Sequence, residues 1–177
     1  GLGVGGNVTV SATKAEIIAT VGNAIYSYRT VEINCDDLWV QNRAPEDNET
    51  WYEYGIFGKN GVKITSEDAS VSAYDSAILS SEGSIDLNGN FHLTSTCGNV
   101  VEATDGSVDM EGTFLLNAFG NNGIKAFADA SVNGSLTINS KKSGVWADAF
   151  FFDGSLLKIT GSGGIDAEND IVIKGTA

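Results

Sequence analysis

A short pattern recurs along this 177-residue chain at a nearly constant spacing, and this repeat restricts the fold more than any other feature. The segments GVKITS, GSIDLNG, GSVDMEG and DIVIKG each contain an apolar residue followed two positions later by a small one. This first apolar anchor falls on Val10, Ile33, Ile64, Leu87, Met110, Val132 and Ile173. Most steps are near 22 residues, and a period of this length is typical of a solenoid, in which each repeat stacks on the next.

A second apolar anchor repeats independently in the same phase. It falls on Ile25, Ile56, Ile78, Val101, Ile124, Val145 and Ile165. A third pair of apolar positions lies between the two anchors: Leu38 with Val40, Ala69 with Val71, Phe91 with Leu93, Phe114 with Leu116, Leu136 with Ile138, and Leu157 with Ile159. Apolar residues alternate with polar ones at period two, which indicates about three short strands in each repeat. Residues 11–22 alone also allow a helix capped by Ser11.

We therefore predict an all-β fold, a right-handed single-stranded parallel β-helix (β-solenoid) of about seven coils of roughly 22 residues. Residues 1–177 form a single solenoid domain, and residues 41–54 are an inserted loop because the step from Ile33 to Ile64 is 31 residues. Near Leu157 the phase is ambiguous, and Phe150, Phe151 and Phe152 form an irregular run. The chain has no initiator Met and stops soon after an anchor, so we expect a piece of a larger protein with further solenoid or other domains.

The charge balance narrows the classes of partner. Lys and Arg total 10 against 23 Asp and Glu, a net charge of −13, so nucleic-acid phosphates and anionic membranes would be repelled. No apolar stretch approaches the ~18 residues of a membrane span, so we expect no membrane insertion. Cys35 and Cys97 are the only cysteines and are predicted to be free thiols, which excludes a disulfide scaffold and a four-cysteine zinc site.

Aromatic residues suggest a ligand-binding surface. The inserted loop contains Trp51, Tyr52 and Tyr54, and Trp39 precedes it on an outward strand position. A row of outward residues directly follows the second anchor: Tyr26, Phe57, Leu79, Glu102, Lys125 and Trp146. The predicted ligand-binding residues are Tyr26, Trp39, Trp51, Tyr52, Tyr54 and Phe57, because aromatic rings stack on the flat faces of sugars. The alternative is that these rings pack against one another as a local core.

Carboxylates also form a row. The outward positions before the first anchor read Glu32, Lys63, Asp86, Asp109 and Ser131. Calcium bridging Asp86 and Asp109, with Glu111, is one interpretation, since hard cations prefer oxygen ligands; solvated carboxylates partly offset by Lys63 are the other. No catalytic residues are predicted, because neighbouring carboxylates occur in any acidic ladder and the only histidine, His92, has no evident partner.

The segments GIKAFADASVNGSLTINSKKSGVWA and GGIDAENDIVIKG resemble the repeats of right-handed parallel β-helix proteins, the pectate-lyase-like superfamily. Within that group the chain is most similar to clostridial-type extracellular carbohydrate-binding β-helix proteins, although it lacks the paired Asp that these favour before the Gly-Ile turn. The resemblance implies a non-catalytic bacterial module, extracellular or at the cell surface, that binds a polysaccharide or cell-surface glycan, with calcium as a candidate cofactor. The alternatives are a polysaccharide lyase or glycoside hydrolase of the β-helix type, and a purely structural adhesin stalk.

Overall fold

The computed structural model describes residues 1–43 and 53–175, which form two parallel eight-stranded sheets and no helix. Within these residues, therefore, no helix is long and apolar enough to cross a membrane. One sheet consists of short strands: β1 (Leu2–Val4), β3 (Ile25–Ser27), β5 (Ile56–Gly58), β7 (Ile78–Ser80), β9 (Val101–Ala103), β11 (Ile124–Ala126), β13 (Ser143–Ala147) and β15 (Gly163–Ala167). The other consists mainly of long strands: β2 (Val8–Ala19), β4 (Thr30–Asn42), β6 (Gly61–Ala73), β8 (Ile85–Ser95), β10 (Val108–Ala118), β12 (Ala130–Ser140), β14 (Phe150–Thr160) and β16 (Ile171–Gly175).

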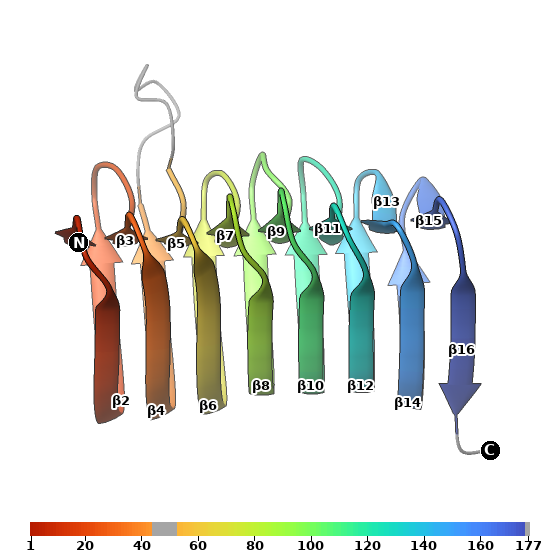
Figure 1. The fold of residues 1–177 in the computed structure, drawn as a ribbon, viewed down its shortest axis with the longest axis horizontal. Helices are drawn as coiled ribbons and strands as arrows, with labels where there is room; N and C mark the ends of the chain where they lie inside the picture. The colour runs from red at the N-terminus through yellow and green to blue at the C-terminus, as the bar shows by residue number, and fades with distance from the viewer. Residues whose placement is uncertain (44–52, 176–177) are drawn as a thin grey trace.

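One short strand and the long strand that follows it make one coil, and successive coils stack side by side (Figure 1). The predicted parallel β-solenoid is confirmed, with about seven turns placed about 23 residues apart. Both anchors and the third apolar pair fall in register: Ile78 pairs with Val101, Leu87 with Met110, and Phe91 with Phe114. Each repeat of the sequence therefore corresponds to one coil of the solenoid.

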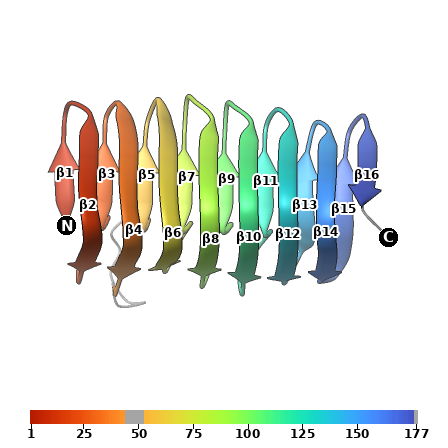
Figure 2. The ribbon, with the colours of Figure 1, turned by 90° about the horizontal axis from the view of Figure 1, so that it is seen from below.

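Each long strand is bent, which modifies the prediction of about three short strands in each coil. It runs down one side of the solenoid and folds back along another, and the bends line up along one edge (Figures 1 and 2). The first anchor and the third apolar pair therefore lie on two arms of one strand, as Leu87 and Phe91 do in β8. Together with the short strands, the two arms enclose a core with three sides.

Glycines form a ladder at the bend. Gly89, Gly112 and Gly134 are register partners with φ between 125° and 131°, a region that favours glycine. A Cβ atom on Gly112 would lie 2.0 Å from the carbonyl oxygen of Gly89, so the bend has no room for a side chain. In earlier coils this position belongs to Cys35 and Ser66, and β4 and β6 are two residues longer than β8. The glycine ladder therefore belongs to the tighter, later coils.

Stacked apolar side chains fill the space between the three sides. The second-anchor residues from Ile25 to Val145 are fully buried, and the phenyl rings of Phe91 and Phe114 stack with centroids 5.3 Å apart. Burying one such side chain stabilises the fold by roughly 1.5–3 kcal/mol, so the repeated ladders supply most of the stability. Among the described residues, every buried side-chain nitrogen and oxygen atom has a hydrogen-bond partner.

The last coils keep the repeat, although the pairing of β12 with β14 shifts register by one residue after Gly134, close to the ambiguity that we expected near Leu157. Phe152 pairs with Val132 and Ile173, so Phe152 is the missing first anchor. The spacing from Val132 to Phe152 is only 20 residues, which hides the phase in the sequence. Phe150 and Phe152 are buried and Phe151 is partly exposed, as strand alternation requires.

Three further local expectations can be compared with the structure. Residues 8–19 form strand β2, so the helical alternative for residues 11–22 is wrong. Strand β4 continues to Asn42, two residues into the predicted loop 41–54, and residues 44–52 of that loop lie outside the described part of the chain. Cys35 is buried, Cys97 is exposed, and both are free thiols as predicted. Burial raises the pKa of the Cys35 thiol.

Candidate functional site

The outward surface of the short strands, which we call the short-strand face, carries the row of side chains expected after the second anchor. Register pairing aligns Tyr26, Phe57, Leu79, Glu102, Lys125 and Trp146 on consecutive coils. A second row lies two residues further along the chain, because each of these side chains alternates with an inward one. It consists of Tyr28, Lys59, Ser81, Thr104 and Phe127.

Four aromatic side chains meet on this face and form what we call the aromatic cluster: Tyr26, Tyr28, Tyr54 and Phe57. The rings of Tyr26 and Phe57 stack with centroids 4.9 Å apart and planes 13° apart. Tyr54 stacks on Phe57 at 5.7 Å, and the rings of Tyr28 and Tyr26 meet at 87°. The rings therefore pack on one another, as the alternative interpretation requires, and ligand binding by these residues stays a prediction. Burial, with the neighbouring Tyr28 side chain, raises the pKa of Tyr26 to about 12.

An apolar hollow of about 330 Å³ opens beside the aromatic cluster. Its lining consists of Tyr26, Tyr54, Phe57, Leu79, Ser81 and Thr104. The register partner of Tyr26 on the preceding coil is Gly3, so no side chain of that ladder covers the outer face of the Tyr26 ring. The hollow thus offers ring surfaces and hydroxyl groups to a ligand.

A carboxylate borders the apolar part of the face. Glu102 lies in the same row as Phe57 and accepts hydrogen bonds from Ser76 Oγ at 3.1 Å and from Asn99 Nδ2 at 2.9 Å. The Nζ atom of Lys125 lies 3.1 Å from Glu102 Oε1. These three partners hold the Glu102 side chain against the strand, and Lys125 balances its charge. Within two coils, the row therefore changes from the aromatic ring of Phe57 to the ion pair of Glu102 and Lys125.

Asp75 lies in the turn before β7, close to Glu102 and Glu53. Burial raises the pKa of Asp75, and the negative charges of Glu102 and Glu53 raise it further, whereas a hydrogen bond from the backbone of Ser76 lowers it. The unfolded chain consequently loses this proton first as the pH rises. The free energy of unfolding should therefore fall as the pH rises from the ordinary pKa of aspartate through the raised pKa in the folded chain.

This linkage gives a first prediction. The substitution Asp75→Asn should remove that part of the pH dependence and raise stability at neutral pH relative to acidic pH, because the amide carries no charge. Urea unfolding from pH 4 to pH 8 measures it, with Asp105→Asn in an exposed turn as the matched control. An unchanged pH profile in Asp75→Asn would show that the Asp75 carboxyl is not destabilised when ionised.

The structure separates the predicted ligand-binding residues. Tyr26, Tyr54 and Phe57 lie together in the aromatic cluster, whereas Trp39 lies on the outward side of β4 and is 40% exposed. Trp39 pairs with Glu16 and Ser70, so it belongs to a different face of the solenoid. Trp51 and Tyr52 lie outside the described residues.

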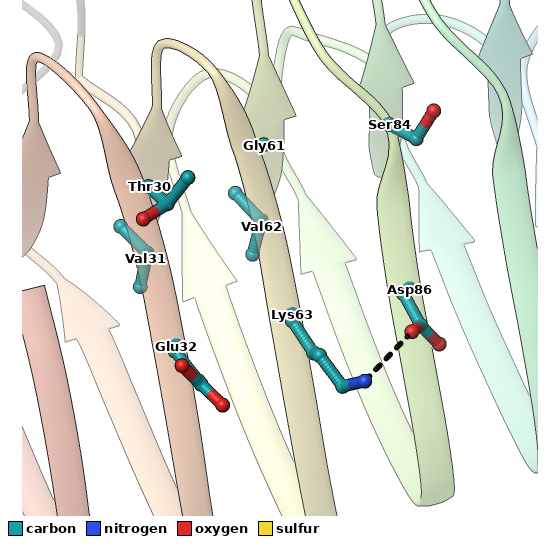
Figure 3. Close-up of a pocket in the computed structure, with 8 residues that line it drawn as sticks. All are labelled: Thr30, Val31, Glu32, Gly61, Val62, Lys63, Ser84 and Asp86. Atoms are coloured by element: carbon teal, nitrogen blue, oxygen red, sulfur yellow. Dashed lines mark ion pairs between the residues drawn. The ribbon is translucent and has the colours of Figure 1, made fainter. Parts of the chain in front are cut away.

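The acidic row lies on the first arm of the long strands. Its predicted register is confirmed, since Glu32 pairs with Lys63, Lys63 with Asp86, and Asp86 with Asp109. Lys63 Nζ lies 3.4 Å from Asp86 Oδ2 beside an open groove of about 270 Å³ (Figure 3). The lysine already supplies a positive charge next to Asp86, although both side chains are more than half exposed and such pairs contribute little.

The rest of the predicted calcium site, Asp109 and Glu111, makes hydrogen bonds to neutral groups. Asp109 Oδ2 accepts from Ser107 Oγ at 3.2 Å, and Glu111 Oε2 accepts from Asn88 Nδ2 at 3.2 Å. Over residues 1–43 and 53–175, no group of three or more acidic, histidine or cysteine side chains could hold a metal ion. Calcium binding by Asp86, Asp109 and Glu111 stays a prediction.

His92 is exposed on the second arm, and its Nε2 atom lies 3.0 Å from Asn117 Nδ2. Asn139 donates a hydrogen bond to Asn117 Oδ1 at 3.0 Å, so these polar side chains form a chain along the coils. The described partners of His92 are therefore neutral amides rather than a carboxylate or a nucleophile.

Sequence reasoning missed three parts of the site: Tyr28, Ser81 and Thr104. A signal for them was present, because each comes two residues after an outward position of the row that includes Tyr26, Leu79 and Glu102. The chain matches no protein-family model, no curated protein and no solved structure. The geometry of the short-strand face is therefore the basis for a functional proposal.

Proposed function

We propose that this chain is a non-catalytic module that binds carbohydrate on its short-strand face. The observation that carries the proposal is the apolar hollow of about 330 Å³, in which aromatic rings lie beside the hydroxyl groups of Ser81 and Thr104. A pyranose ring presents apolar C–H groups on its faces and hydroxyl groups at its edge. Such a ligand suits a recess that combines aromatic surface with a few polar groups.

Charge favours a neutral glycan over an acidic one. The two lysines of the face are each paired with a carboxylate, Lys59 with Glu82 at 3.0 Å and Lys125 with Glu102 at 3.1 Å. The net charge of −13 adds long-range repulsion of polyanions. The proposed ligand is accordingly a neutral polysaccharide or a neutral part of a cell-surface glycan.

The proposal includes the setting suggested by the resemblance to clostridial-type carbohydrate-binding β-helix proteins. We propose an extracellular or cell-surface location, where a solenoid that holds glycans would act in adhesion. Calcium is a candidate cofactor at Asp86, Asp109 and Glu111, on the long strands rather than on the short-strand face. Retention on a glycan should therefore survive a chelator.

The second prediction tests the face directly. The substitution Phe57→Ala should weaken glycan binding about tenfold, because it removes the ring that stacks on both Tyr26 and Tyr54. Affinity electrophoresis against a panel of neutral and acidic polysaccharides, with calcium and with chelator, measures the effect. Phe151→Ala is the matched control, because Phe151 is a partly exposed phenylalanine on a long strand.

Other outcomes of the same panel would contradict the proposal. Retention that is lost in Trp39→Ala but kept in Phe57→Ala would move the site to the outward side of β4. No retention on any glycan would contradict carbohydrate binding and favour a structural stalk. Release of reducing or unsaturated sugar ends would indicate a hydrolase or lyase.

A further inference from the structure

A second aromatic group lies on the short-strand face, beyond the ion pair of Glu102 and Lys125. Trp146 occupies the next position in the row after Lys125, and Phe127 lies in the parallel row, two residues beyond Lys125. Phe127 is 64% exposed, which is unusual for a phenylalanine. These two side chains, which we call the distal pair, are separate from the aromatic cluster and line none of its hollow.

Register fixes the distance between the two aromatic groups. Tyr28 and Phe127 belong to one row and are four coils apart, with Lys59, Ser81 and Thr104 between them. At about 4.8 Å per coil, the backbones of Tyr28 and Phe127 are about 19 Å apart along the solenoid axis. Tyr28 is 58% exposed, so both ends of this row present an aromatic ring to solvent.

The surface between the two groups is low, polar and balanced in charge. Ser81 and Thr104 have short hydroxyl side chains, and the Thr104 hydroxyl donates to the backbone of Ser81 at 2.9 Å. Glu102 and Lys125 neutralise each other along the other row. Lys59, which also lies between the aromatic groups, pairs with Glu82 at 3.0 Å, so each charged side chain of the two rows on these coils has an oppositely charged partner.

We propose that the aromatic cluster and the distal pair are the two ends of one track, which binds a single extended polysaccharide chain parallel to the solenoid axis. This inference rests on the proposed function. In an extended β-1,4-linked chain each sugar advances the chain by a distance close to one coil. Consecutive sugars would therefore meet equivalent positions on consecutive coils, with the end sugars on aromatic rings and the middle ones over Ser81 and Thr104. The ligand class is a neutral, extended β-1,4-linked polysaccharide.

Because the track spans several coils, affinity should depend on the number of sugars in the oligosaccharide. This dependence is the third prediction. Isothermal titration calorimetry with cello-, xylo- and manno-oligosaccharides, from disaccharide to hexasaccharide, should show affinity rising about tenfold or more before it levels off at the pentasaccharide or hexasaccharide. Trp146→Ala and Phe127→Ala should reduce the affinity of the hexasaccharide toward that of the disaccharide. Phe151→Ala is again the control, and circular dichroism checks the fold of each variant.

The outcomes separate the two proposals. Binding that is independent of chain length, or a hexasaccharide affinity unchanged in Trp146→Ala and Phe127→Ala, would overturn the track and leave a short site at the aromatic cluster. Binding of acidic glycans alone would overturn the track, because its charges are already paired. No binding of any glycan would overturn both the track and the proposed function.

Discussion

Replacing Gly112 by alanine should lower the free energy of unfolding by roughly 3 kcal/mol or more. Two costs add at this position. Gly112 has a φ of 128°, a conformation that residues with a Cβ atom rarely adopt. The new methyl group would also lie 2.0 Å from the carbonyl oxygen of Gly89, which is backbone and cannot rotate away. Relief requires the stacked coils to separate at the bend, where backbone hydrogen bonds hold them together.

Urea unfolding followed by far-UV circular dichroism measures this effect. The matched control is Gly164→Ala in β15, because a Cβ atom there would meet nothing within 4 Å and the backbone has no positive φ between 20° and 160°. We expect the control to change stability by less than about 1 kcal/mol. Equal effects of the two substitutions would show that the glycine ladder is not required at the bend.

The fold could be predicted because each inward position recurs in every coil. An apolar residue at Ile78, Val101 and Ile124 signals little by itself, but three such series in one phase leave few alternatives to a solenoid. Strand alternation then assigns outward residues as well, which is why the row from Tyr26 to Trp146 was predicted with the correct register. Periodicity carries both kinds of information at once.

Changes in the length of individual coils limited the prediction of the other features of the fold. In the later coils the bend of the long strand is absent from the apolar pattern, because Gly89 keeps the inward phase between Leu87 and Phe91 and alternation continues through it. Phe152 was missed because the step from Val132 to Phe152 is two or three residues shorter than the two steps before it. The average period of the sequence does not show such changes in single coils, whereas the backbone must accommodate each of them.

The candidate site was predicted only in part, for a different physical reason. Alternation predicts that Tyr26 and Phe57 point outward, but not that their rings stack on each other at 4.9 Å. It also gives no indication that Asn99 and Ser76 hold the Glu102 carboxylate, because side-chain rotamers decide those contacts. Trp39 shows the converse, since closeness in sequence to the inserted loop suggested a shared site and the bent strand places Trp39 on another face.

The second large effect is expected in the core. Phe114→Ala should lower the free energy of unfolding by about 3–5 kcal/mol, because it removes a large side chain that is only 1% exposed and leaves a cavity between rigid neighbours. Phe114 stacks on Phe91 at 5.3 Å, and its register partner on the other side is Leu136. Backbone hydrogen bonds on both sides fix the coil spacing, so the core is poorly able to collapse into the gap.

Two control variants separate the cavity from the loss of an aromatic ring. Phe114→Leu should cost less than about 1.5 kcal/mol, because leucine already occupies the same ladder at Leu136 and Leu157. Phe119→Ala should change stability by less than about 0.5 kcal/mol, since Phe119 is 66% exposed. Chemical denaturation of the three variants at one pH compares them directly. A loss below about 1 kcal/mol in Phe114→Ala would mean that the coils close the cavity by moving together, and the ladder would then be less rigid than its hydrogen bonds require.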